Sequence, residues 1–313
     1  MVDSVPAVKA RLVLRGFEEQ DKVRSDSPTC RKVNIRTFLT IAQAKGWTIN
    51  SLDVKAAFLQ GNQIQRDVFI RAPREAKSSK AVWKLRKVVY GLSDASRSWY
   101  LRLVEALESL GMKTLLLDKA VFIWKVNAVV QGMVIIHVDD MLFFGSEHFH
   151  LEIIGKFKKL FKISREEQES FNFLGVRLHQ TSEYIVLEQD AYIEALSVDL
   201  VHRHLLKDKE EHASEEQKKR FREGVGQLGW LEGTTQPQLG FAFCQLSTVQ
   251  SDPQMKDYSR YSKVIKDRKG QKMKSLIPNV DLGTLLAYSD ASYGNLRDGG
   301  SQLGYLSIAG FIR

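Results

Sequence analysis

Apolar residues recur along this chain with both strand-like and helix-like spacing. Alternation and short apolar runs predict strands at 7–17, 47–54, 67–71, 82–86, 120–126, 172–178 and 184–188, the last two pairing as a hairpin. Apolar positions three and four residues apart predict helices at 31–45, 98–110, 147–161 and 191–196, with a further helix starting at 56–59. Because strands and helices do not alternate regularly, the pattern favours an α+β fold with an antiparallel sheet.

The composition changes after residue 205. Residues 205–220 are a charge run without apolar periodicity, which fits either a linker or the start of an exposed helix. Residues 221–267 regain helical spacing, broken near Pro237 and Pro253, and residues 268–280 are basic and loop-like. Two further strands are predicted at 284–290 and 303–308. The second part of the chain is therefore predicted to be mostly helical, followed by a separate β unit.

Two adjacent acids, Asp139 and Asp140, lie within one of the most apolar segments, residues 133–145. The apolar arms predict the two strands of a hairpin, with the acids at or beside its turn. Burying neighbouring negative charges is costly unless a cation offsets them, and a divalent metal ion is the usual answer. The segment therefore predicts a metal-dependent site displayed on a sheet.

A third acid, Asp53, is predicted at the end of the strand 47–54. On its own, an aspartate at a strand end is more simply a turn or cap residue. If its strand joins the same sheet, Asp53 lies beside Asp139, and three carboxylates could hold two divalent ions. Mg²⁺ is the expected ion, with Mn²⁺ as an alternative, because Mg²⁺ takes oxygen ligands and completes its shell with water and phosphate.

Composition narrows the class of protein. A length of 313 residues suggests about two domains, and 43% apolar content is enough for a packed core. The net charge of +9 favours a polyanionic partner such as nucleic acid over basic residues that only solvate the surface. Two cysteines, Cys30 and Cys244, make no disulfide framework and fit a reducing compartment. No apolar run approaches the roughly 18 residues that span a membrane, so no membrane partner is expected.

Several ordered blocks resemble the reverse transcriptase of copia-type (Pseudoviridae) LTR retrotransposons. They are Lys9-Ala10-Arg11-Leu12-Val13 with Gly16-Phe17, Gly46-Trp47, Leu52-Asp53-Val54-Lys55-Ala56-Ala57-Phe58-Leu59-Gln60-Gly61, Val89-Tyr90-Gly91-Leu92 with Arg97, Trp99 and Tyr100, His137-Val138-Asp139-Asp140-Met141, Phe173-Leu174-Gly175, Gly226-Gln227-Leu228 and Gln236-Pro237. Near the end, Tyr288-Ser289-Asp290-Ala291-Ser292 resembles the first strand of the attached RNase H domain. One block would be weak evidence, but together they follow the family's order over nearly the whole chain.

The resemblance implies an RNA-directed DNA polymerase with a right-hand fold. Residues 1–205 would be fingers and palm, 206–280 a mostly helical thumb or connection, and 281–313 a truncated RNase H-like start. The partners would be an RNA or DNA template with its primer, dNTPs and other parts of a retrotransposon polyprotein. Such polymerases usually work in cytoplasmic particles, although the sequence encodes no address.

The resemblance also assigns roles to single residues. Asp53, Asp139 and Asp140 would form the catalytic triad. Asp53 and Asp139 would bind both metal ions, the Val54 carbonyl would be a backbone ligand, and Asp140 would be less direct. The nucleotide-binding residues would be Lys9 or Arg11 on the triphosphate, Phe58 as the aromatic gate against a 2′-hydroxyl, and Gly91 at a close backbone approach. Each of these residues also has a simpler interpretation: Lys9 and Arg11 as a basic strand edge, Phe58 as a core aromatic and Gly91 as a turn glycine.

The sequence also departs from the family pattern. His137 replaces the usual Tyr, and Ser93-Asp94-Ala95-Ser96 replaces a segment with Lys and Pro, which should weaken template contacts. Asp290 is the one clear RNase H carboxylate, so no RNase H activity is expected. The ends suggest a piece of a longer polyprotein. A decayed or domesticated fragment that binds nucleic acid without polymerising is therefore the alternative function, whereas a cellular enzyme that reuses the palm fold is disfavoured by the ordered blocks.

Basic residues form several clusters that, as a set, would line a nucleic-acid duplex. Each cluster taken alone is equally explained as an ordinary solvated face. They are Arg71, Arg74, Lys77 and Lys80; Lys84, Arg86 and Lys87; Lys156, Lys158 and Lys159; and Lys263, Lys266, Arg268, Lys269, Lys272 and Lys274.

Overall fold

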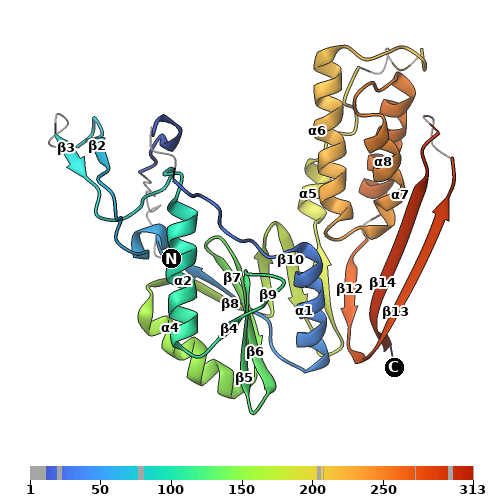
Figure 1. The fold of residues 1–313 in the computed structure, drawn as a ribbon. Coiled ribbons are helices and arrows are strands. Elements are labelled where there is room, and N and C mark those ends of the chain that lie inside the picture. The colour runs from blue at the N-terminus through green and yellow to red at the C-terminus, as the bar shows by residue number, and fades with distance from the viewer. Residues whose placement is uncertain are drawn as a thin grey trace, which may run out of the picture. The chain divides into compact units, whose positions relative to one another are not determined.

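The computed structural model describes residues 12–19, 23–76, 81–202, 206, 208–271, 273–294 and 299–312. The chain divides into two compact units. The first comprises residues 1–31 and 50–166, and the second comprises residues 32–49 and 167–313. Helices and antiparallel sheets occur in both units (Figure 1), which agrees with the α+β class predicted from the sequence.

A six-stranded sheet forms the centre of the first unit, in the order β4-β5-β6-β7-β1-β8. Its strands are β1 (Asn50–Val54), β4 (Lys113–Thr114), β5 (Val121–Val126), β6 (Val129–His137), β7 (Asp140–Gly145) and β8 (Ile163–Gln168). Residues 133–136 and 141–144 are almost completely buried, which explains why these two strands read as continuous apolar runs rather than as alternating ones.

Helices of the first unit pack beside this sheet (Figure 1). They are α2 (Ala95–Ser109) and a continuous helical segment made of α3 (Glu147–Phe149), a π-helical stretch (His150–Ile154) and α4 (Gly155–Leu160). Two glycines paired across β6 and β7, Gly132 and Gly145, make room for the ring of Phe149. A Cβ atom at Gly132 would lie 2.1 Å from that ring, so larger side chains are excluded there.

Smaller elements complete the first unit. They are the 3₁₀ turns η1 (Gly16–Glu18) and η2 (Ala57–Gln60) and the strands β2 (Phe69–Arg71) and β3 (Val82–Lys84), which pair with each other. The helix predicted to start at 56–59 is the short 3₁₀ turn η2, and the two short strands predicted at 67–71 and 82–86 are confirmed.

The second unit contains a four-stranded antiparallel sheet, a helical group and a long hairpin. The sheet runs in the order β12-β11-β10-β9, with β9 (Ser170–Phe173), β10 (Val176–Gln180), β11 (Tyr184–Glu188) and β12 (Ser275–Pro278), and α1 (Lys32–Ala44) packs against it. The other helices are α5 (Asp190–Ala195), α6 (Glu215–Glu232), η5 (Pro237–Leu239), α7 (Gly240–Thr248) and α8 (Met255–Gly270), which share one apolar core. Strands β13 (Val280–Ser292) and β14 (Gln302–Ile312) form the hairpin.

Three sequence predictions of local structure were wrong. The described part of 7–17 is not a strand: residues 12–15 are irregular and η1 follows, whereas residues 7–11 lie outside the described residues. The run 172–178 is not one strand but the hairpin β9–β10, because Leu174 and Gly175 take positive φ angles and reverse the chain. Residues 268–280 are not a loop, since α8 continues to Gly270 and Pro278 ends β12, an edge strand where its missing N–H is tolerated.

Candidate active site

The two adjacent acids lie at a hairpin turn, as the sequence predicted. Strands β6 and β7 pair from Gly132↔Gly145 to His137↔Asp140, which leaves Val138 and Asp139 as a two-residue loop. Val138 has a φ of +61°, while Asp139 does not have a positive φ. This sign pattern is that of a type II′ turn, whose first central position normally holds glycine. A β-branched residue there is a strained exception, and strain of this kind concentrates at functional sites.

A buried tryptophan supports the strained turn. The indole Nε1–H of Trp99 donates a hydrogen bond of 3.0 Å to the carbonyl oxygen of Val138. Trp99 comes from α2 and is fully buried, with its ring 5.3 Å from the ring of Phe161. The sequence placed Trp99 in the helix predicted at 98–110 and in one of the blocks that resemble the family. No sequence signal indicated that its polar edge would reach the loop.

The structure brings all three predicted acids together. Strands β1 and β7 pair in a register that sets Asp53 directly opposite Asp140. Residues paired in this way point to the same face of a sheet, with Cβ atoms about 5 Å apart. Asp139 is the next residue in the turn, so Asp53 is in register with Asp140 rather than with Asp139.

Burial and mutual repulsion shape the electrostatics of this cluster. The pKa of Asp140 lies above its ordinary value, first because the carboxyl group is half-buried and then because Asp139 and Asp53 are near, while His137 and Arg165 act in the opposite direction. Burial also lowers the pKa of His137, against the attraction of Asp140 and Asp139. Its Nδ1 is buried without a hydrogen-bond partner in the described part of the chain. The site therefore concentrates negative charge beside a histidine that favours its neutral form.

The donor set suits a divalent cation. Three carboxylates within one hairpin and its neighbouring strand supply the hard oxygen ligands that Mg²⁺ takes, and a bound cation would remove the repulsion that raises the pKa of Asp140. Among the described residues, however, no group of three or more His, Cys, Asp or Glu side chains is already arranged to hold one ion. The residues fit such an ion by their chemistry, and its coordination stays a prediction.

Two side chains without a predicted role hold the strand end that carries Asp53. The Ser164 hydroxyl, on β8, contacts both the main-chain oxygen of Asp53, at 2.9 Å, and its carboxylate Oδ2. The Gln60 amide donates to the carbonyl oxygens of Lys55, at 2.6 Å, and Lys162, at 3.1 Å. Because five of the six residues of β8 are polar or charged, the apolar pattern predicted no strand there.

The predicted nucleotide-binding residues have structural roles of their own. Phe58 is buried in η2, with its ring 4.6 Å from that of Tyr90, and the side chain of Val54 is buried at the end of β1. Gly91 has a φ of +94°, and a Cβ atom there would lie 2.0 Å from the carbonyl oxygen of Leu14. The glycine is thus required by the chain's own backbone. Lys9 and Arg11 lie outside the described residues.

The unusual Ser93–Ser96 segment is held by an ion-pair network. Asp94 is the N-cap residue of α2, and its carboxylate pairs with Arg66. The same guanidinium pairs with Glu19 at 2.6 Å, and Ser93 donates to Glu19 at 3.2 Å. These charged side chains are at most 20% exposed, so the acid gained in this segment has a cationic partner within the chain, which it shares with Glu19.

Outside this site, several other predicted residues have local partners. Asp290 is exposed on β13, and its Oδ1 accepts a hydrogen bond from the Ala291 N–H. In the basic clusters, Lys84, Lys156, Lys158 and Lys274 pair with Asp67, Glu152, Glu166 and Glu188. Of the predicted clusters, Lys77, Lys80 and Lys272 lie outside the described residues. Among the described helices, none is both long and apolar enough to cross a membrane.

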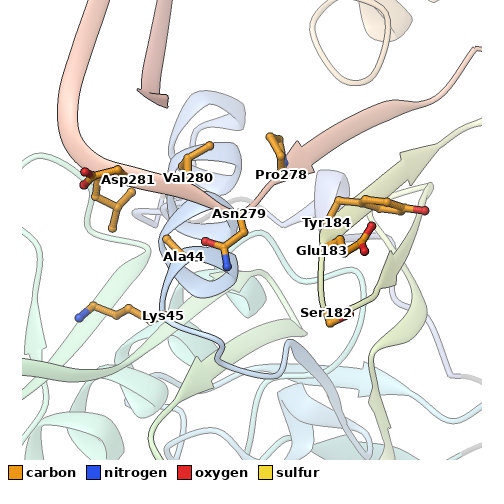
Figure 2. Close-up of a pocket in the computed structure, with 10 residues that line it drawn as sticks. Ala44, Lys45, Ser182, Glu183, Tyr184, Pro278, Asn279, Val280 and Asp281 are labelled. Atoms are coloured by element: carbon orange, nitrogen blue, oxygen red, sulfur yellow. The ribbon is translucent and has the colours of Figure 1, made fainter. Parts of the chain in front are cut away.

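A cavity of about 920 Å³ lies in the second unit. It is bordered by the C-terminal end of α1, the β10–β11 turn and the β12–β13 junction. Figure 2 shows Lys45 and Asp281 on one side of it and Glu183 and Tyr184 on the other. Its charged residues are of both signs and include none of the predicted site residues, so the cavity itself indicates no ligand class.

Comparisons with known proteins identify the family. A model of the reverse transcriptase (RNA-dependent DNA polymerase) family matches residues 3–203. The chain is 30% identical over 197 residues to the retrovirus-related Pol polyprotein from transposon RE1 of Arabidopsis thaliana, covering 61% of this chain and 13% of the relative. It is 27% identical over 332 aligned residues to that from transposon RE2 of the same plant, covering 99% of this chain and 22% of the relative.

A more distant relative is the transposon Ty1-GR3 Gag-Pol polyprotein of Saccharomyces cerevisiae, 26% identical over 190 residues, which are 57% of this chain and 10% of the relative. The chain spans less than a quarter of the length of each of these relatives. The ordered blocks, the family match over residues 3–203 and these relatives agree. The chain therefore belongs to the reverse transcriptase (RNA-dependent DNA polymerase) family, as a member of its copia-type retrotransposon branch.

Proposed function

We propose that this chain is an RNA-directed DNA polymerase that extends a primer with dNTPs. The observation that carries the proposal is the register of β1 and β7, which sets Asp53 opposite Asp140 with Asp139 in the adjoining turn. Three acids at neighbouring strand ends of one sheet suit a reaction in which charge develops on phosphate oxygens. The membership in the reverse transcriptase family supports the same reaction.

In this proposal the reaction is attack of a primer 3′-hydroxyl on the α-phosphate of a dNTP. Asp53, Asp139 and Asp140 are its catalytic residues, and the Asp53 and Asp139 carboxylates with the Val54 carbonyl would hold Mg²⁺. When bound, Mg²⁺ would lower the pKa of the 3′-hydroxyl and neutralise charge on the triphosphate. The chain's own part is positioning: the Trp99 hydrogen bond holds the turn, and the buried strands fix the register of the acids.

The nucleotide would contact residues around this edge. Phe58, packed on Tyr90, would lie under the sugar, and its fixed position would disfavour a 2′-hydroxyl. Lys9 or Arg11 would contact the triphosphate, and the Gly91 turn would form part of the nucleotide or template surface. The basic clusters would bind duplex phosphates without reading sequence, so affinity would fall steeply with salt.

The proposal extends to domains and partners. The sheet of the first unit would be the palm, residues 206–280 would be the thumb or connection, and residues 281–313 an RNase H-like start without activity. An RNA or DNA template with its primer would be the main partner. The Pol polyprotein relatives support a further association with other parts of such a polyprotein.

Primer extension on poly(rA)/oligo(dT) with Mg²⁺ or Mn²⁺ tests the proposal. The wild-type chain is expected to incorporate dTTP, and Asp139→Asn to abolish incorporation. Asp290→Asn is the matched control, because it removes an exposed strand carboxylate outside the triad and should leave extension unchanged. If the wild-type chain binds the duplex but extends no primer at saturating protein, the chain is a nucleic-acid-binding fragment and the proposal fails.

A further inference from the structure

Asp53, the acid on β1, has a hydrogen-bond partner outside the catalytic triad. Ser164, on β8, lies beside Asp53 at the edge of the six-stranded sheet. Its Oγ is 2.9 Å from the main-chain oxygen of Asp53 and in still closer contact with the carboxylate Oδ2. A serine hydroxyl has one proton to donate. Because the carboxylate is negatively charged and the main-chain carbonyl is not, the hydroxyl donates its proton to Oδ2.

The backbone around this contact is fixed by a clamp. The Lys55 N–H donates to the Lys162 carbonyl at 2.9 Å, and the Lys162 N–H donates to Gln60 Oε1 at 2.8 Å. The Gln60 amide closes the clamp on both segments. Ser164 follows Lys162 by two residues, so the beginning of β8 cannot shift along β1 without breaking these hydrogen bonds. The hydroxyl is therefore held at the carboxylate rather than meeting it by chance.

We propose that Ser164 is a positioning residue for the polymerase reaction, which fixes the carboxylate of Asp53 through Oδ2 and leaves Oδ1 directed to the metal site. In the described part of the chain, Oδ1 accepts no hydrogen bond. A carboxylate with one oxygen held keeps one rotamer, and a ligand that is already oriented loses less freedom when it binds a cation. This inference rests on the proposed function.

Ser164→Ala removes the hydroxyl and little else, because the side chain is small and the residue is exposed. Partners that orient a metal ligand typically contribute about 10- to 100-fold in metal affinity or activity. The exposed position favours the lower end, so kcat for dTTP incorporation is expected to fall about tenfold. The KM for dTTP is expected to stay unchanged, since the hydroxyl faces the acid and not the nucleotide. Ser164→Thr keeps the hydroxyl, suits a strand and should restore kcat.

Ser109→Ala is the matched control. It also removes a serine hydroxyl from the first unit, where Ser109 donates to the Ala106 carbonyl at 2.7 Å at the end of α2. It should change neither kcat nor metal binding. A second readout is Mn²⁺ binding to the chain without nucleic acid, measured by electron paramagnetic resonance, in which Ser164→Ala is expected to weaken affinity about tenfold.

The outcomes separate the two proposals. If the wild-type chain extends no primer but Ser164→Ala still weakens Mn²⁺ binding, the orientation of the Asp53 carboxylate by Ser164 stands and the polymerase function fails. If the wild-type chain is active and Ser164→Ala matches Ser109→Ala in both kcat and Mn²⁺ affinity, the positioning role is overturned and the function stands. A Ser164→Thr variant as defective as Ser164→Ala also overturns it, because the hydroxyl would then not be the active feature.

Discussion

Replacing Val138 by glycine tests whether the catalytic turn stores strain. Val138 has a φ of +61° at the first central position of the β6–β7 turn. Backbone strain of this kind costs about 1–3 kcal/mol, and about 2 kcal/mol is a reasonable middle value for a β-branched residue. Glycine adopts the same angle freely, so the substitution would release this energy.

Two losses of stability oppose this release of strain energy. Glycine gives the unfolded chain more freedom, which costs about 0.7 kcal/mol. Val138 is only partly buried, so removing its side chain costs about 0.7 kcal/mol, roughly half of the value for full burial. The three contributions leave a net stabilisation of about 0.6 kcal/mol. Without strain the same change would destabilise the protein by about 1.4 kcal/mol. The sign of the change in the free energy of unfolding therefore shows whether the turn is strained.

The measurement is urea unfolding followed by circular dichroism, together with primer extension. Val138→Gly should unfold at the same or a higher urea concentration than wild type, and extension should slow because the freed turn no longer holds Asp139. Ala128→Gly is the matched control: Ala128 has a φ of +65° in the exposed β5–β6 turn, so glycine should stabilise it without changing extension. A loss of about 1.4 kcal/mol in Val138→Gly would refute the strain argument.

Other changes test packing and charge. Gly132→Ala should lower the free energy of unfolding by about 1–3 kcal/mol, because the new methyl group meets the Phe149 ring, whereas Gly226→Ala, where a Cβ atom meets nothing within 4 Å, should raise it by about 1 kcal/mol; urea unfolding measures both. The pKa of Asp140 is raised in the folded state, so its ionisation opposes folding. Asp140→Asn should therefore be more stable than wild type at neutral pH, and this advantage should shrink as the pH falls through the ordinary pKa of aspartate. Thermal melts from pH 3 to 7 in which the advantage of Asp140→Asn does not increase with pH would contradict this. His137→Tyr should supply a hydroxyl beside the turn and leave extension active, and an inactive variant would show that the family's usual residue no longer fits here.

Much of the fold was predictable because burial leaves a direct trace in the sequence. The apolar arms around Asp139 and Asp140 can form only buried strands, and the confirmed helix α1 shows a clear apolar face at Phe38, Leu39 and Ala42. The β9–β10 hairpin escaped prediction because its turn, at Leu174 and Gly175, lies inside an apolar run. Strand β8 escaped because it is mostly polar, so pairing with β1 and not apolar spacing determines its conformation.

The acids of the candidate site were predictable from the sequence, but the side chains that hold them in place were not. The apolar context indicated Asp139 and Asp140, and the family resemblance added Asp53. The hydrogen bonds from Trp99 and Ser164 join residues 39 and 111 positions apart in the chain, and no local pattern encodes such contacts. The ion pair of Asp94 with Arg66 is likewise a long-range contact, and it gives an acid that seemed unfavourable for template binding a cationic partner within the chain.

The rate of single-nucleotide incorporation by Asp53→Asn tests the central claim most directly, because Asp53 joins the site only through the pairing of β1 with β7. The change keeps the size of the side chain and removes its charge. With primer–template and dTTP saturating, the rate should fall by about a hundredfold or more, the scale of losing one group that stabilises the transition state, while duplex affinity stays unchanged. An Asp53→Asn variant that incorporates dTTP at the wild-type rate would contradict the account.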